Sequence, residues 1–152
     1  MAEHHNGSGP GTLFVVGTGP GSPEHLTPAA AAALNNAEII VGYSTYLDLI
    51  PTYLEGKEVI ASTMMKEVER CRKCLELAMD GKKVALVSGG DPGIYAMAGL
   101  VYEMARDLDS DCIIEVVPGI AAVNGCAARL GAPLMHDFAA VSLSDLLTPW
   151  EL

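Results

Sequence analysis

The sequence predicts an α/β fold, with an open, mostly parallel five-stranded sheet and helices on both faces. Short apolar runs that suit buried strands alternate along the chain with amphipathic or alanine-rich segments that suit helices. Glycine and proline follow several of the apolar runs, as they do at the turns of strand–turn–helix units. With 152 residues, of which 50% are hydrophobic, the chain is long enough for one domain with a sizeable core.

Strands are expected where apolar or β-branched residues run together. Residues 138–142 are expected to form a fifth strand, and residues 58–61 carry a weaker signal for one more short strand. The clearest signals are over residues 13–16, 38–41, 84–87 and 112–117. The helices between successive strands make these strands parallel.

Helices are expected where alanine dominates or where apolar residues recur three and four positions apart. Thr27 and Pro28 form a cap and first-position pair for a helix over residues 28–36. Residues 66–80 predict an amphipathic helix, which Gly81 ends. Its apolar stripe is Val68, Cys71, Leu75, Ala78 and Met79. The other segments are a short helix or loop over 43–50, a strand–turn–helix unit over 112–131, and a polar-capped segment over 145–152.

The chain is organised around residues 84–98. A buried strand is followed by Gly89 and Gly90, which free the backbone to turn sharply and let a ligand come close. Asp91 then lies where a helix cap or a ligand contact is expected, and Pro92 suits the first position of a helix. The apolar face of that helix is expected at Ile94, Met97, Ala98, Val101, Met104, Ala105 and Leu108. Small ligands bind at the carboxyl ends of strands in open α/β sheets, but an ordinary tight turn with a capping aspartate fits these residues equally well.

The glycine-rich loop after the first strand does not match a nucleotide-binding fingerprint. Gly17, Gly19 and Gly21 give the spacing G-x-G-x-G in place of G-x-G-x-x-G, and no acidic residue ends the second strand. No Gly-Lys-Ser/Thr follows, which excludes a Walker loop. Because Pro20 and Pro23 stiffen the segment, we expect a ligand-facing loop that is not a pyrophosphate cradle.

Charge and composition restrict the partners. The formal net charge of −10 argues against nucleic acid and an anionic membrane surface, since both are bound through clustered Lys and Arg. No apolar run approaches the roughly 18 residues that span a bilayer. Residues 1–11 are expected to form a disordered arm without the apolar segment of a signal peptide. We therefore expect a cytoplasmic protein.

The mean hydropathy of the chain, +0.30, indicates a face buried against another subunit or domain, although richness in Ala and Val explains the value nearly as well.

Cys71 and Cys74 are expected to be reduced, structural residues. A redox C-x-x-C pair lies at a helix N-terminus, where the thiolate is stabilised, whereas this pair lies inside a helix. Zinc would need Cys112 and Cys126 as a second pair, and their separation is too wide for a zinc knuckle. No metal site is expected.

Several stretches together resemble the tetrapyrrole (corrin and porphyrin) methylases. They are Val16-Gly-Thr-Gly-Pro-Gly-Ser-Pro-Glu-His-Leu-Thr27, Ser88-Gly-Gly-Asp-Pro-Gly-Ile-Tyr95 and Val117-Pro-Gly-Ile-Ala-Ala122. Residues 41–50 and 131–151 further resemble the branch of that family that methylates C17 of precorrin-3B in cobalamin biosynthesis. The resemblance covers residues 12–152. It implies the first of two α/β domains, with the second, which closes the active-site cleft, absent, and it implies a homodimer.

The resemblance implies S-adenosylmethionine as the cofactor and S-adenosylhomocysteine as its product. The cofactor contacts that it carries over are Pro20, Gly89, Gly90, Asp91, Ile94, Ala121 and Ala122. Candidates on the substrate side are Gly19, Tyr43 and His136, and a structural role fits His136 as well. In related uroporphyrinogen methylases an aspartate at the end of the second strand acts as a base, but Tyr43 holds that position here, so the catalytic residues stay unassigned. The C17 branch usually has Ser-Ser-Gly-Asp-Pro where this chain has Ser88-Gly-Gly-Asp-Pro92.

The activity implied is transfer of the sulfonium methyl to C17 of precorrin-3B, or of its cobalt form, with contraction of the macrocycle. Positioning matters more than a strong base in such a reaction, because the ring carbon is electron-rich and the sulfonium is a good leaving group. The partner is then a small tetrapyrrole, and a fragment without its second domain is expected to be inactive. Two other functions fit the sequence: another enzyme of the same fold, and a non-catalytic binding or dimerisation module.

Overall fold

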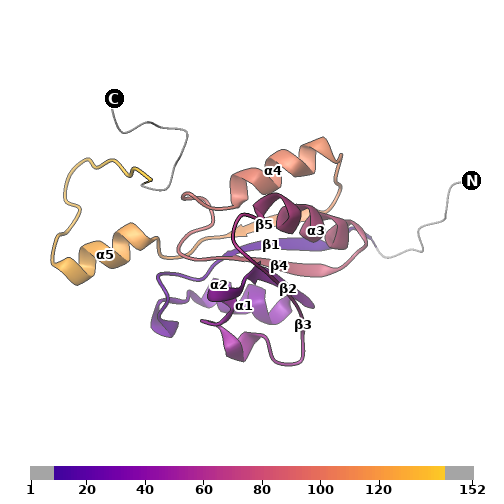
Figure 1. The fold of residues 1–152 in the computed structure, drawn as a ribbon, viewed down its shortest axis with the longest axis horizontal. Helices are drawn as coiled ribbons and strands as arrows, with labels where there is room; N and C mark the ends of the chain where they lie inside the picture. The colour runs from indigo at the N-terminus through magenta and orange to yellow at the C-terminus, as the bar shows by residue number, and fades with distance from the viewer. Residues whose placement is uncertain (1–8, 143–152) are drawn as a thin grey trace, which may run out of the picture.

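The structure, a computed structural model, describes residues 9–142 and is built on a five-stranded sheet in which every strand pairs in parallel (Figure 1). The strands are β1 (Thr12–Gly17), β2 (Ile39–Tyr43), β3 (Glu58–Ser62), β4 (Lys83–Ser88) and β5 (Ile113–Val117). They lie in the order β3-β2-β4-β1-β5. The predicted open, five-stranded α/β sheet is confirmed, and no antiparallel strand interrupts it among the described residues.

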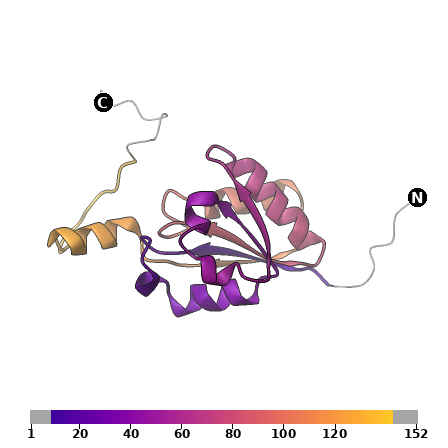
Figure 2. The same cartoon turned by 60° about the horizontal axis from the view of Figure 1, so that its bottom comes forward.

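Helices cover both faces of the sheet. Helix α1 (Pro28–Asn36) and the short α2 (Ser44–Leu47) lie on one face, and α3 (Glu67–Met79) and α4 (Ala98–Asp107) lie on the other (Figures 1 and 2). Helix α5 (Ala122–Leu130) extends past the end of the sheet (Figure 1). Two 3₁₀ turns, η1 (Pro23–His25) and η2 (Pro51–Tyr53), lie in the loops. Helix α1 has the predicted bounds, and its predicted cap is formed: the N–H of Ala30 donates to Thr27 Oγ1 over 3.1 Å.

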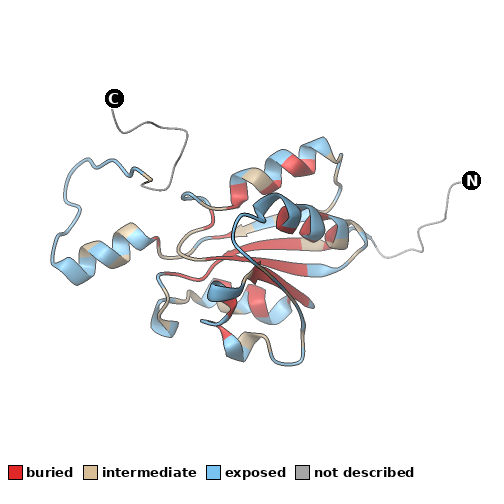
Figure 3. Ribbon diagram, viewed as in Figure 1, coloured by how far each residue is buried: buried red, intermediate tan, exposed pale blue. Residues whose placement is uncertain are grey.

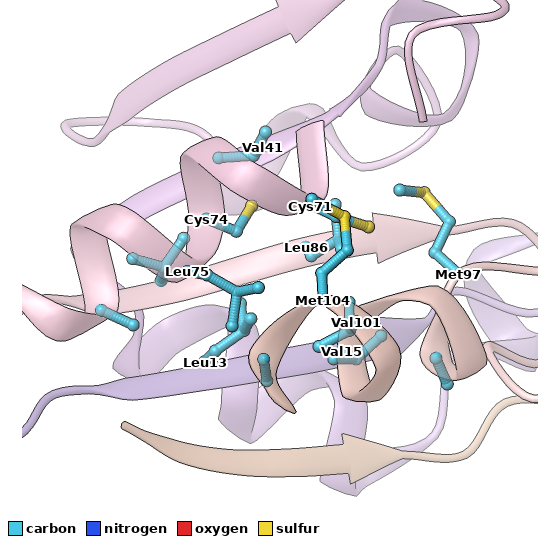
Figure 4. Close-up of a cluster of buried hydrophobic side chains, with 14 of the residues drawn as sticks. Leu13, Val15, Val41, Cys71, Cys74, Leu75, Leu86, Met97, Val101 and Met104 are labelled. Atoms are coloured by element: carbon cyan, nitrogen blue, oxygen red, sulfur yellow. The ribbon is translucent and has the colours of Figure 1, made fainter. Parts of the chain in front are cut away.

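Alternate residues of the central strands contribute to two separate cores. Leu13, Val15 and Leu86 face α3 and α4, and Figure 4 shows them packed beneath the side chains of those helices. Phe14 and Val16 face α1 and α2 on the other side. Because both faces are covered, the central strands are buried at nearly every position (Figure 3). Burial of each large aliphatic side chain contributes about 1.5–3 kcal/mol to folding.

The buried face of α3 differs in part from the predicted stripe. Val68, expected in the core, is 54% exposed, whereas Cys74, which was not assigned to the stripe, is fully buried. In the first turn the interior position belongs to Arg70, whose guanidinium donates to Ser62 and Thr63 at the end of β3. Val68 therefore points to solvent.

The two cysteines of α3 belong to this core. Burial raises the pKa of the Cys71 thiol to about 11, and burial also raises the pKa of Cys74. Both thiols are protonated at neutral pH and pack as small apolar side chains. This environment fits the structural role predicted for them.

Two predicted elements are wrong. The helix expected from Pro92 begins at Ala98, because Tyr95 has a φ of +48°, in the left-handed region that a right-handed helix excludes. Ile94 consequently belongs to a loop and is 50% exposed. Residues 138–142 form no strand. They follow α5, which leads the chain away from both edges of the sheet, so no neighbouring strand is within reach (Figure 1).

The predicted N-terminal arm falls mostly outside the described residues, as does the segment predicted over 145–152. Gly11, the last residue of that arm, is buried: its N–H donates to the carbonyl of Ala78 over 2.9 Å, and its carbonyl accepts from the N–H of Ile113 over 3.0 Å. None of the helices between residues 9 and 142 is long and apolar enough to cross a membrane.

Candidate functional site

The carboxyl ends of β1 and β4 mark the point where the connections of the sheet diverge. These strands are neighbours, yet the chain leaves β1 toward β2 through α1 on one face and leaves β4 toward β5 through α4 on the other. In open α/β sheets such a switch point opens a crevice that binds ligands. The fold therefore directs attention to the loops that follow β1, β4 and β5.

Backbone hydrogen bonds join the first two of these loops. The N–H of Gly19 donates to the carbonyl of Gly90 over 3.1 Å, and the N–H of Gly90 donates to the carbonyl of Gly19 over 2.8 Å. Thr18 fastens the same loop, since its N–H (2.9 Å) and its Oγ1 (3.1 Å) both donate to the carbonyl of Ser88. Because its N–H is already engaged, Gly90 offers a ligand an open surface and not a backbone donor.

The loops approach so closely that only glycine fits between them. A Cβ on Gly119, in the loop after β5, would lie 2.2 Å from the carbonyl oxygen of Gly90. A Cβ on Gly17 would lie 2.5 Å from the same oxygen. Since the obstacle is backbone and not a flexible side chain, glycine at these two positions sets the spacing of all three loops.

Asp91 clamps the loop after β4 to the loop after β5. Its Oδ1 accepts from the N–H of Gly93 over 2.8 Å, and its Oδ2 accepts from the N–H of Gly119 over 3.1 Å. The carboxylate therefore shapes the loops, and it caps no helix, because α4 begins seven residues later at Ala98. Of the two roles that the sequence left open for this region, the simple helix cap is wrong.

The three loops and the start of α5, together with Tyr46, Leu49 and residues 140–141, line an open cavity of about 430 Å³. All the residues predicted to contact the cofactor lie on its wall, namely Pro20, Gly89, Gly90, Asp91, Ile94, Ala121 and Ala122, and so does Gly19. Gly21, in the loop expected to face a ligand, also lines it, and the sequence missed the other lining residues, which are Tyr46, Leu49, Tyr95, Val123, Ala140 and Val141. The volume lies within the range of about 300–1,000 Å³ that is usual for small-molecule sites.

Tyr46 closes the cavity from the side of α2. Its ring lies against Gly89, where a Cβ would come within 2.7 Å of the ring carbon Cε1. The absence of a side chain at Gly89 was the one sequence signal for a bulky neighbour. Tyr43, a predicted substrate residue, does not line the cavity, but its ring meets that of Tyr46 edge to face at a centroid distance of 5.5 Å. His136 is exposed and lies outside the cavity wall.

The first turn of α5 presents backbone donors to the cavity. The N–H groups of Ala122 and Val123 precede the internal hydrogen bonds of that helix, and both residues line the cavity. Pro20 holds the first loop against α5, since a Cβ on Gly125 would lie 3.1 Å from its ring. Among residues 9–142, no three His, Cys, Asp or Glu side chains lie close enough together to hold a metal ion. The arrangement is suited to binding and orienting a small molecule through backbone groups and small side chains.

Comparison with known proteins shows which family the chain resembles. The model of the Tetrapyrrole (Corrin/Porphyrin) Methylases matches residues 12–152. A probable cobalt-factor III C(17)-methyltransferase of Salmonella typhimurium is 51% identical over 140 residues, which are 92% of this chain and 58% of that protein. A precorrin-3B C(17)-methyltransferase of Sinorhizobium sp. is 45% identical over 146 residues, with 93% of this chain and 57% of that protein covered. The chain therefore spans little more than half the length of these two relatives.

Solved structures agree. The crystal structure of the methyltransferase CobJ matches 93% of this chain and 59% of its own, with a TM-score of 0.85 and 40% identity. The uroporphyrin-III C-methyl transferase of Thermus thermophilus, solved in complex with S-adenosylhomocysteine, matches 84% of this chain and 54% of its own, with a TM-score of 0.62 and 28% identity. The matched model, the two relatives and the shared fold lead to one conclusion: the chain belongs to the tetrapyrrole methylase family.

Proposed function

We propose that this chain is the S-adenosylmethionine-binding part of a C17-methyltransferase of cobalamin biosynthesis, which acts on precorrin-3B or on its cobalt form. The observation that carries the proposal is the cavity at the carboxyl ends of β1, β4 and β5, because its wall holds every residue predicted to contact the cofactor. The similarity to the C(17)-methyltransferases of Salmonella and Sinorhizobium, one named for cobalt-factor III and one for precorrin-3B, supports the C17 reaction and the two forms of the substrate.

The residues of the cavity fit the cofactor. Its volume of about 430 Å³ suits a nucleoside with an amino-acid side arm. Gly90, with a φ of +64°, leaves the wall without a side chain beside the backbone of Ala121 and Ala122. The N–H groups of Ala122 and Val123 are placed to donate to carboxylate, ribose or ring acceptors. The bound S-adenosylhomocysteine of the Thermus thermophilus enzyme supports the same assignment here.

The chain contributes positioning. When bound, the cofactor supplies an electrophilic methyl group on its sulfonium. The clamp formed by Asp91 and the bonded pair Gly19 and Gly90 fix the loops before a ligand arrives, so little ordering is required on binding. The side chains of Tyr46 and Tyr95 line the same cavity as Ala121. Holding the methyl group in line with a nucleophilic ring carbon is the step for which these residues are suited.

The family resemblance supports further properties of the whole protein. We propose a small tetrapyrrole as substrate, a homodimer as the assembly and the cytoplasm as the location, with no nucleic-acid partner. The net charge of −10 supports the last point, because RNA-binding surfaces are rich in Lys and Arg.

Two measurements test the proposal. Calorimetric titration of S-adenosylhomocysteine into the chain is expected to show one saturable site, and adenosine alone is expected to bind more weakly because it lacks the amino-acid arm. Transfer of a labelled methyl group to precorrin-3B and to cobalt-factor III is then measured with the chain extended to the length of its relatives. A chain that binds neither nucleoside, or an extended enzyme that methylates neither tetrapyrrole, contradicts the proposal. Binding without any methyl transfer favours the non-catalytic module.

A further inference from the structure

A second, smaller chamber opens beside the cofactor cavity, on the side of α3 and α4. It measures about 190 Å³ and shares Tyr46, Gly89 and Tyr95 with the cavity. Met97 supplies part of its apolar wall, while Arg70 and Ser88 are its buried polar residues. The methyl transfer proposed above uses neither of these two polar side chains.

Arg70 is buried with part of its hydrogen-bonding capacity unused. The side chain is 6% exposed. Its Nη1 donates to Ser62 Oγ over 2.8 Å and to the carbonyl of Thr63 over 2.9 Å, and its Nη2 donates to Glu67 over 3.0 Å. The Nε–H has no partner among the described residues. Such a donor lowers the stability of the free chain unless something accepts from it.

Ser88 repeats the pattern on the same chamber. It ends β4, is 3% exposed, and its Oγ has no hydrogen-bond partner among residues 9–142. A hydroxyl rotates to donate in whichever direction an acceptor lies. Both residues line the chamber, and each carries a buried donor without a partner among the described residues, so the two donors would form a donor set for the oxygens of a ligand that entered.

We propose that the chamber binds a carboxylate carried on a short aliphatic arm, with one oxygen accepting from Arg70 Nε and the other from the Ser88 hydroxyl. An arginine with a free N–H favours a charged oxygen over a neutral one. The apolar wall suits the methylene groups of an acetate or propionate arm. Both donors are shielded from solvent, so a wall side chain gives way as the arm enters, and the unbranched side chain of Met97 is suited to do so.

The carboxylate has two possible sources if the proposed function holds. It belongs either to an acetate or propionate arm of the tetrapyrrole or to the methionine part of the cofactor in the adjoining cavity. The choice of source rests on the proposed function, whereas carboxylate binding by the chamber does not.

Glu67 gives the proposal a distinctive electrostatic signature. Its carboxylate is 47% exposed, lines the chamber and pairs with Arg70 Nη2, so it repels a second carboxylate that approaches Nε. Glu67→Gln retains an oxygen that accepts from Nη2 and removes the charge. This change is expected to tighten carboxylate binding about fivefold. A purely structural ion pair between Arg70 and Glu67 predicts no such gain.

Nuclear magnetic resonance of the chain tests the proposal with sodium propionate as the probe and propionamide as its neutral control. Propionate is expected to shift the Nε–H resonance of Arg70 saturably, and propionamide is expected to leave it unchanged. Ser88→Ala is expected to weaken propionate binding about tenfold. The matched variant Ser110→Ala, which changes a serine between α4 and β5, is expected to leave binding unchanged. The Arg70 proposal is overturned if no saturable shift occurs, if propionamide acts equally, or if Ser88→Ala and Glu67→Gln both bind propionate like the parent.

A titration in saturating S-adenosylhomocysteine separates the two sources. If propionate still binds, the chamber is free for an arm of the substrate. If S-adenosylhomocysteine itself shifts the Arg70 resonance and blocks propionate, the carboxylate is that of the cofactor. If the chain binds propionate but not S-adenosylhomocysteine, the carboxylate site is supported and the proposed function is contradicted. If it binds S-adenosylhomocysteine but not propionate, only the carboxylate site is contradicted.

Discussion

The substitution Gly119→Ala tests the junction of the three loops. The new Cβ would lie 2.2 Å from the carbonyl oxygen of Gly90, far inside the 3.4 Å at which ordinary contact begins, and 2.8 Å from the carbonyl carbon of Gly17. Both obstacles are backbone, so the loops after β1 and β4 must separate from the loop after β5. The cost is expected at the upper end of the range for overpacking, about 2–3 kcal/mol. The bond from the Gly119 N–H to Asp91 is strained at the same time.

Thermal unfolding and calorimetry measure the two consequences. The Tm is expected to fall by roughly 5–10 °C for a chain of this size. Affinity for S-adenosylhomocysteine is expected to fall at least about tenfold, because the displaced loops form the cavity. The matched control is Gly99→Ala in the exposed part of α4, where a Cβ meets nothing within 4 Å. The control is expected to gain about 0.5–1 kcal/mol from helix propensity. If Gly119→Ala unfolds within a degree of the parent and binds with unchanged affinity, the reasoning about the junction is refuted.

Three further predictions use the same assays. Gly90→Val and its control Gly56→Val both place a β-branched residue at a φ near +70°, so both are expected to lose about 1–2 kcal/mol of stability. Only Gly90→Val is expected to abolish S-adenosylhomocysteine binding, because Gly90 lines the cavity whereas nothing lies within 4 Å of a Cβ at Gly56. Equal affinities in the two variants would contradict this prediction. Asp91→Asn replaces one carboxylate oxygen by a donor that faces a backbone N–H, and a loss of about 1–2 kcal/mol in urea unfolding is expected, with an unchanged midpoint as the opposing result. The pKa of Cys71 is about 11 in the folded chain against 9.0 in the unfolded chain, so its contribution to stability is fully present below pH 9 and is lost as pH rises through 11, at up to about 1.4 kcal/mol per pH unit. The raised pKa of Cys74 acts in the same direction. If the loss of stability with pH persists unchanged in a variant with alanine at both positions, these thiols are not its source.

The sheet and its helices could be predicted because their signals are local. The alanine-rich segment with its Thr27 cap gave α1 its bounds, and unbroken apolar runs marked β1 and β4 as strands covered on both faces. Residues 138–142 have the composition of a strand, but a strand also needs an edge to pair with, and composition carries no information on that. The helix start at Pro92 failed for a similar reason, since the left-handed backbone at Tyr95 depends on the surrounding loops.

The cavity could be predicted only in part. The resemblance to the tetrapyrrole methylases supplied the wall residues that were predicted, and several of them are glycines or other small residues, as is required where chains approach closely. Tyr46 and Tyr95 were missed because nothing local distinguishes a tyrosine that lines a cavity from one on the surface. Tyr43 was predicted as a substrate residue because of its place at the end of β2. Its ring contacts that of Tyr46, which lines the cavity, but Tyr43 does not line the cavity itself.

Arg70 illustrates the limit most clearly. In the sequence it is one of several charged residues that fill the polar positions of an amphipathic helix. Its burial depends on the end of β3, which supplies Ser62 and Thr63 as partners at distances that no periodicity encodes. Both the missed core position and the proposed carboxylate site follow from that one tertiary arrangement.

Chemical-shift mapping of S-adenosylhomocysteine onto the backbone amides of the chain tests the central claim most directly. The account predicts saturable shifts concentrated at Gly19, Asp91, Ala122 and Val123, around the carboxyl ends of β1, β4 and β5. Gly56 and the amides of the distant end of α4 are expected to remain unshifted. Saturable shifts that fall away from this cavity, or no shifts at concentrations that saturate other members of the family, would contradict it.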